Sequence, residues 1–125
     1  MKLVPLFKVR DMRAAITHYT QVLDFVLTCP EDNADSGVVD LGHEETELQI
    51  TVFENAQLFG SVVNVHVSNV DDLFAKFLSR GLETSFNPNS PVHAAPVDQT
   101  WGRREFYVTD SDGNTLRYCT QFKSE

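Results

Sequence analysis

The sequence predicts an α+β fold of two βαβββ modules within a single domain, and three patterns carry this prediction. A shift of 58 positions superposes a strand, a helix-capping residue and an apolar helix stripe of the first half on those of the second. Each half then continues with short runs of alternating apolar and polar side chains, as strands do. The chain closes with a hairpin around a glycine turn. We therefore assign residues 1–58 to the first module and residues 59–125 to the second.

The first half reads as a strand, a helix and three further strands. Strands are expected at residues 3–9, 25–29, 37–41 and 47–53, with an acidic loop at 31–36 and a turn at 42–45. Pro5 has no N–H to donate to a neighbouring strand. We therefore expect the first strand to lie at an edge of its sheet, or Pro5 to stand at the start of the strand. Asp11 fits a helix N-cap, and the helix should run from Met12 to about Asp24. Its apolar stripe comprises Met12, Ala15, Ile16, Tyr19 and Leu23.

The second half repeats this order after a linker at residues 54–60. A strand at 62–67 precedes Asn69, the expected N-cap, and Gly81 fits a C-cap. The helix between them presents the stripe Val70, Leu73, Phe74, Phe77 and Leu78. A short strand should follow at 82–85, and then a loop at 86–100 with three prolines. A structureless loop of that length favours a functional role or a partner-binding arm.

The last two strands carry the most distinctive pattern of the chain. Residues 103–109 alternate, with Arg103, Glu105 and Tyr107 on one face and Arg104, Phe106 and Val108 on the other. Residues 110–114 have turn chemistry, because Gly113 allows a positive φ and the flanking Asp and Asn side chains can bond their own backbone. Residues 115–120 run back as the final strand.

This run resembles the C-terminal signature of the vicinal-oxygen-chelate superfamily, which includes glyoxalase I, extradiol dioxygenases and bleomycin resistance proteins. The resemblance lies in Trp101-Gly102, in Arg104-Glu105-Phe106 and in the turn at 110–114, where Ser111 replaces the usual proline. The combination is most similar to the bleomycin resistance branch. The resemblance implies that each module forms a curled sheet, that the sheets enclose a cavity, and that ligands bind on the concave face.

Most enzymes of that superfamily hold a divalent metal with one ligand from the first and one from the last strand of each module. The resemblance assigns these four positions to Val4, Gln49, Val62 and Arg117. Valine has no donor atom and arginine is a fixed cation, so these residues cannot make a divalent site. We therefore expect no metal, no cofactor and no catalytic residue.

Composition limits the remaining classes of function. The net charge of −8 repels nucleic acid. No apolar run approaches the ~20 residues of a membrane helix, and the N-terminal apolar run is too short for a signal peptide. A cytoplasmic location is the resulting expectation. Cys29 and Cys119 lack the spacing of a disulfide scaffold or a metal site.

Three functions remain open at this stage. The first is a non-catalytic bleomycin-binding protein that sequesters the antibiotic, as the resemblance implies, and that forms a homodimer. Its ligand would be cationic and aromatic, and Arg117 would repel it unless a carboxylate pairs with that arginine. The second is a metal-dependent enzyme like glyoxalase or a dioxygenase, and the third is a binding protein for another small aromatic molecule. The candidate ligand-binding residues are Trp101, Tyr107, Phe59, Glu47, Gln49, Asn64, His66, Glu105 and Arg117.

Overall fold

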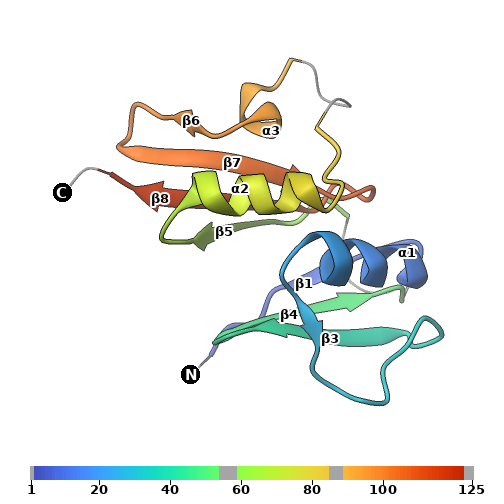
Figure 1. The fold of residues 1–125 in the computed structure, drawn as a ribbon. Helices are drawn as coiled ribbons and strands as arrows, with labels where there is room; N and C mark the ends of the chain where they lie inside the picture. Colours follow the sequence, from blue (N-terminus) through green and yellow to red (C-terminus); the bar gives the residue numbers. More distant parts are fainter. Residues whose placement is uncertain (1, 54–58, 85–88, 123–125) are drawn as a thin grey trace. The chain divides into compact units, whose positions relative to one another are not determined.

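The computed structural model describes residues 2–53, 59–84 and 89–122, and the chain divides into two compact units. The first unit comprises Met1–Ser61 with the turn Asp110–Asn114, and the second comprises Val62–Thr109 and Thr115–Glu125. Each unit has its own four-stranded sheet and its own helices (Figure 1). The predicted α+β class and the order of strand, helix and three strands are confirmed in both units.

The first unit contains a mixed sheet with strand order β1-β4-β3-β2. Strand β1 runs parallel to β4, and the other pairs are antiparallel. Strand β1 lies at one edge of this sheet and Pro5 comes just before it, as expected. The Pro5 carbonyl accepts the Gln49 N–H at 3.0 Å. The elements are β1 (Leu6–Lys8), α1 (Met12–Thr17), a π-helical turn η1 (His18–Val22), β2 (Val26–Leu27), β3 (Val38–His43) and β4 (Thr46–Thr51).

The predicted cap and stripe organise the core of this unit. The Asp11 carboxylate accepts the Ala14 N–H at 3.0 Å, which satisfies one of the free donors at the helix start. Tyr19 is buried, and its ring centroid lies 6.3 Å from that of Phe7 and 5.9 Å from that of Phe25. The apolar face of the helix therefore packs on the sheet, as its periodicity predicts.

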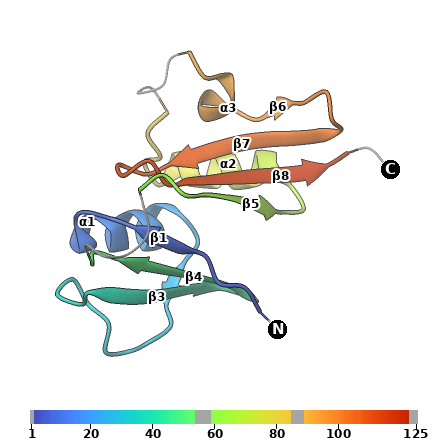
Figure 2. The same cartoon turned by 180° about the vertical axis from the view of Figure 1, so that it is seen from behind.

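The second unit repeats this topology with strand order β5-β8-β7-β6 (Figures 1 and 2). Strand β5 runs parallel to β8, and β8, β7 and β6 pair antiparallel. Asn69 caps α2 by accepting the Asp72 N–H at 3.1 Å, and Gly81 adopts φ 96° beyond its end. The elements are β5 (Val62–His66), α2 (Val70–Ser79), α3 (Pro91–Ala94), β6 (Val97–Asp98), β7 (Arg103–Thr109) and β8 (Thr115–Gln121).

Aromatic packing forms the core between α2 and the sheet of this unit. The Phe106 ring stacks on Tyr118 at 5.0 Å and meets Phe74 edge-on at 5.2 Å. Arg104, on the same face of β7, pairs with Asp71 of α2 at 2.9 Å and with Asp98 of β6 at 3.0 Å. The predicted alternation of β7 is thus confirmed, because Arg104 and Phe106 both contact elements on the helix side.

Two expectations about the second unit are wrong. Residues 82–84 form no strand, and the second strand of the unit lies instead at Val97–Asp98. The loop expected at 86–100 contains this strand and the helical turn α3, so its described part is not structureless. The remaining residues of these two expected segments, 85 and 86–88, lie outside the described residues, as does most of the expected linker at 54–60.

Several element boundaries also differ from the sequence expectations. The first strand is only three residues long, and the strand expected at 25–29 has only two residues. Strand β3 continues to His43, so the turn that follows it consists of Glu44 and Glu45. Helix α1 gives way to a π-helical turn that ends at Val22 rather than near Asp24. In the described residues, no helix is long and apolar enough to cross a membrane.

The turn Asp110–Asn114 is tied to the first unit by several hydrogen bonds. The Asn114 side chain is fully buried, donates to the Lys8 carbonyl at 2.8 Å and accepts the Ser61 N–H at 3.1 Å. The Asp110 carboxylate accepts the Tyr19 hydroxyl at 2.8 Å. Gly113 adopts φ 86°, which a residue with a Cβ rarely does.

Replacing the buried amide should therefore destabilise the protein. Asn114→Ala leaves the Lys8 carbonyl and the Ser61 N–H without the Asn114 side chain as their partner. This loss should lower the free energy of unfolding by about 1–3 kcal/mol. Denaturant titration measures this change. Asn64→Ala, at an exposed position of β5, is the matched control and should change stability by about 0.5 kcal/mol or less. Equal effects of the two variants would contradict the assigned role of Asn114.

Stability should also fall as the solution is acidified through the histidine range. Burial lowers the pKa of His18 below its usual value, while the nearby Asp110 carboxylate opposes this shift. The His18 Nε2 atom is buried and has no hydrogen-bond partner in the described residues. The unfolded chain therefore binds a proton at His18 more tightly than the folded protein does. The stability that depends on a neutral His18 is complete above about pH 6.5, and it is lost as the pH falls below that value.

Denaturant titrations at several pH values between 5 and 8 test this expectation. His18→Gln should flatten the profile, although not completely, because burial also lowers the pKa of His93. An unchanged pH dependence in His18→Gln would show that His18 does not contribute.

Candidate functional site

The open face of the second sheet gathers most of the candidate side chains. Since Phe106 and Tyr118 contact α2, their neighbours along β7 and β8 point to the opposite side. The register aligns two rows of residues across β5, β8 and β7, three neighbouring strands that Figure 2 shows from behind. One row is Asn64, Arg117 and Tyr107, and the other is His66, Cys119 and Glu105.

Glu105 lies at the centre of a hydrogen-bonded cluster on this face. Only 2% of its surface is exposed. Its Oε2 atom accepts the Trp101 indole N–H at 3.2 Å, and its Oε1 atom accepts the Tyr107 hydroxyl at 3.1 Å. The Arg117 Nη2 atom lies 3.7 Å from Oε1. A buried carboxylate is costly unless it is paired and hydrogen-bonded, and these three neighbours meet that condition.

Arg117 and Tyr107 form the second part of the cluster. Arg117 donates from Nη2 to the Tyr107 hydroxyl, and its guanidinium carbon lies 4.6 Å from the centroid of the tyrosine ring. Burial, together with Glu105, raises the pKa of Tyr107, and Arg117 opposes this. The tyrosine therefore stays protonated at neutral pH and can donate to the carboxylate. The charge of Arg117 is balanced by Glu105 within the cluster.

Trp101 is the exposed member of this group. Its side chain is tied to Glu105 through the indole N–H, yet 54% of the residue is exposed. Gly102, at φ 87°, turns the chain into β7, and its carbonyl accepts the Phe122 N–H at 3.0 Å. The indole is thus a flat apolar surface whose polar edge is anchored, an arrangement suited to stacking on another ring.

The remaining members of this face are polar but offer no nucleophile. The Cys119 Sγ atom lies 3.6 Å from His66 Nδ1. Cys119 is buried, and this burial raises the pKa of its thiol. Reactive cysteines have lowered pKa values, so this pair does not have the electrostatics of a nucleophilic thiolate. Asn64 and His66 are exposed beside it.

Sequence reasoning missed a second group of residues that supports Tyr107. His93 of α3 hydrogen-bonds through Nδ1 to the Ser90 hydroxyl and through Nε2 to the Thr109 hydroxyl, each at 2.7 Å. Its ring meets that of Tyr107 edge-on at 5.8 Å. Burial lowers the pKa of His93, which favours the neutral ring. Serine followed by Pro91 is a helix-start signal that could have revealed α3.

The other three candidates belong to the first unit, and each is engaged with its own chain. Glu47 forms an ion pair with Lys2, and Gln49 donates to Asp40 at 2.9 Å. The Phe59 ring is covered by Arg10, whose guanidinium carbon lies 3.9 Å from the ring centroid. The second unit therefore brings together Trp101, Tyr107, Glu105 and Arg117, whereas Phe59, Glu47 and Gln49 belong to the first unit and are bound there by other partners.

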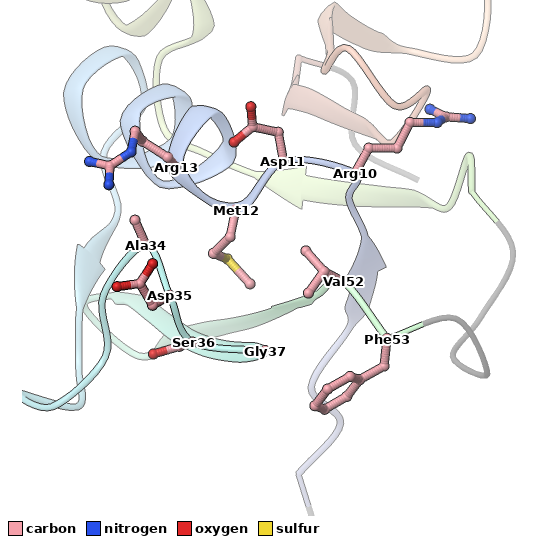
Figure 3. A pocket seen from close by; sticks show the side chains of 10 residues that line it. All are labelled: Arg10, Asp11, Met12, Arg13, Ala34, Asp35, Ser36, Gly37, Val52 and Phe53. Carbon is pink, nitrogen blue, oxygen red and sulfur yellow. The ribbon is translucent and has the colours of Figure 1, made fainter.

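The first unit also has a shallow pocket of about 670 Å³ (Figure 3). Met12 and Val52 form its apolar part, and Phe53 stands at its edge. The acidic loop at 31–36 contributes one wall, with Asp35 the charged residue there. None of the candidate residues lines it. Its complete lining is Arg10, Asp11, Met12, Arg13, Ala34, Asp35, Ser36, Gly37, Val52 and Phe53.

The positions that would hold a metal do not fit one. Val4 precedes β1, and the register places Leu6, which has no donor atom, opposite Gln49. In the second unit Asn64 lies opposite Arg117, whose guanidinium is bound to Tyr107. Across the described residues, no three His, Cys, Asp or Glu side chains are grouped closely enough to bind a metal ion.

Comparison with known proteins identifies a matching family. The profile of the Glyoxalase/Bleomycin resistance protein/Dioxygenase superfamily matches residues 5–118. A search of curated protein sequences gave no match.

Solved structures match over nearly the whole chain. A bleomycin resistance determinant encoded on the transposon Tn5 has a TM-score of 0.75 and 17% identity, covering 97% of this chain and 98% of that chain. A bleomycin-binding protein in complex with bleomycin has a TM-score of 0.73 and 18% identity, with the same coverage. A bleomycin-binding protein from Streptomyces verticillus, in complex with copper(II)-bleomycin, has a TM-score of 0.69 and 20% identity, covering 94% and 93%. At these identities the likeness shows the fold.

Proposed function

Because the chain belongs to the Glyoxalase/Bleomycin resistance protein/Dioxygenase superfamily, we propose that it binds a bulky, cationic, aromatic antibiotic of the bleomycin type. It sequesters the drug without transforming it. Structures similar to this chain include proteins described as bleomycin-binding. Fold alone does not determine function, so the proposal depends on the side chains of the open face.

The observation that carries the proposal is the exposed, anchored indole of Trp101. More than half of this residue is exposed while its N–H is bound to the buried Glu105. A planar heterocycle that stacks on such a ring gains apolar contact. Because the indole is already held in place, binding costs little side-chain conformational entropy. Tyr107 extends the aromatic surface on the same face of the sheet.

The charge distribution supports a cationic ligand. Arg117 would repel such a ligand if it were unpaired, but Glu105 balances it at 3.7 Å. The chain as a whole carries a net charge of −8. The ligand's cationic group would therefore be attracted by the protein's overall field, and salt would screen this attraction over ~8–10 Å.

A metal-dependent enzyme is the weaker alternative. Enzymes of this kind need a Lewis acid to polarise the oxygens of the substrate. Val4, Val62 and Arg117 supply no suitable donor for it, and Gln49 is bound to Asp40. A binding protein for a different small aromatic molecule uses the same Trp101 surface, so a ligand panel must separate it from the first proposal.

Calorimetry with bleomycin and phleomycin at low salt is the direct test of the proposal. We expect one drug per site, no change in the drug, and weaker binding as salt rises. Trp101→Ala should weaken binding about ten- to a hundredfold, since it removes the stacking surface. Prior dialysis against a chelator should leave the affinity of the protein unchanged.

Phe53→Ala is the matched control, because Phe53 is equally exposed but lines the pocket of the first unit. It should leave drug affinity unchanged. If no binding is detected at a drug concentration of about 100 μM, any dissociation constant must be weaker than that value. Such a result would favour a different ligand. Unrelated cationic and aromatic compounds in the same panel would then identify its class.

We also propose that the protein is a homodimer in the cytoplasm. Large apolar side chains are exposed in both units, with Leu3 87% exposed, Trp101 54% and Phe122 51%. A second copy would remove such surface from water. Both cysteines are free, which fits a reducing compartment.

Light scattering coupled to gel filtration tests the oligomeric state. A dimer mass is expected at micromolar concentration, and a monomer mass there would contradict the proposal. Trp101→Ala should keep the dimer mass if the indole serves ligand stacking. Dissociation of that variant would make Trp101 an interface anchor instead.

A further inference from the structure

The two oxygens of Glu105 serve different parts of the open face. Oε2 accepts the Trp101 indole N–H, while Oε1 accepts the Tyr107 hydroxyl and faces Arg117. The carboxylate is 98% removed from solvent, because only 2% of the residue is exposed. Glu105 is therefore enclosed by its own neighbours and does not offer its charge to a ligand.

We propose that Glu105 is a positioning residue, which acts on the ligand through Trp101. This inference rests on the proposed function, since it concerns the same face of the sheet. Its carboxylate fixes the direction of the indole N–H and so the plane that the exposed ring presents. Its charge also neutralises Arg117, which would otherwise oppose a cationic ligand on this face.

Hydrogen-bond chemistry explains why a carboxylate is needed at this position. All three neighbours of Glu105 present donors: an indole N–H, a phenol O–H and a guanidinium N–H. An ionised carboxylate is a pure acceptor and can satisfy them together. Glutamine has the same shape, but its NH₂ group would confront one of the donors. A preformed ring orientation reduces the ordering that ligand binding would otherwise require.

The free protein provides the first test, which requires no ligand. Trp101 is the single tryptophan of the chain, so the near-ultraviolet circular dichroism of tryptophan and the indole N–H resonance report this side chain alone. In the wild type we expect a strong tryptophan dichroism band and an indole N–H protected from solvent exchange. Glu105→Gln should weaken the band and accelerate the exchange.

Ligand affinity provides the second test. Glu105→Gln should weaken binding of bleomycin about three- to tenfold, as expected when one side chain must be ordered on binding. In a Trp101→Phe background, which lacks the indole N–H, the same substitution should have a smaller effect. Such non-additivity is the signature of action through Trp101.

Two further variants separate positioning from charge and from general stability. Glu45→Gln removes the same charge at an exposed turn and should change neither the dichroism nor the affinity. Tyr107→Phe removes the hydroxyl from Oε1 but leaves the bond from Trp101 to Oε2, so the tryptophan band should persist. Thermal unfolding of each variant establishes that it is folded at the temperature of measurement.

The inference would be overturned by rapid exchange of the indole N–H in the wild type, a result that needs no variant. It would also be overturned if Glu105→Gln left the dichroism and the affinity unchanged, or acted equally in the two tryptophan backgrounds. Absence of any drug binding by the wild type would remove the proposed function instead. The protected indole and its release in Glu105→Gln would then still establish Glu105 as the residue that orients Trp101.

Discussion

The five-residue turn Asp110–Asn114 fixes the register of the β7–β8 hairpin, and this register decides which side chains reach the open face. The Asp110 N–H donates to the Asn114 carbonyl at 2.9 Å, and the first pair beyond the turn is Thr109 opposite Thr115. A slip of one residue would turn every side chain of a strand to the other face. It would place Glu105 against α2 and expose Phe106. The buried bonds of Asn114 and the positive φ of Gly113 hold the turn in one form, so the candidate site depends on residues that are not part of it.

The same register explains how one sheet can carry an apolar core and a charged cluster. Arg104, Glu105 and Phe106 are consecutive, yet each has a separate environment. Phe106 fills the core against Phe74, and Arg104 joins α2 to β6 through Asp71 and Asp98. Glu105 points the other way and accepts hydrogen bonds from Trp101 and Tyr107. A buried carboxylate at this position is stable because the opposite strand supplies Arg117 and the preceding turn supplies Trp101.

Features encoded locally were predictable from the sequence, whereas features that need a distant partner were not. The caps at Asp11 and Asn69, the helix stripes and the alternation of β7 follow from residue type and spacing alone. The two-residue strand β6 has no such pattern, since it forms only by pairing with β7. Trp101, Tyr107 and Glu105 could be placed together because they are neighbours in the sequence. The engagement of Phe59 by Arg10 depends on two chain segments that lie far apart in the sequence and that the pattern does not bring together.

This distinction also bears on what the signature of the family can specify. Phe106 and Asn114 are buried, Glu105 is enclosed by its neighbours, and Arg104 is held between two aspartates. These residues therefore maintain the fold and the hairpin. Recognition of a ligand must come from groups that remain accessible. On the open face of the second sheet, the indole of Trp101 is such a group, and its orientation is set by a residue of the signature. Selection for a new ligand could alter the exposed ring while the carboxylate beneath it continued to satisfy its remaining donors.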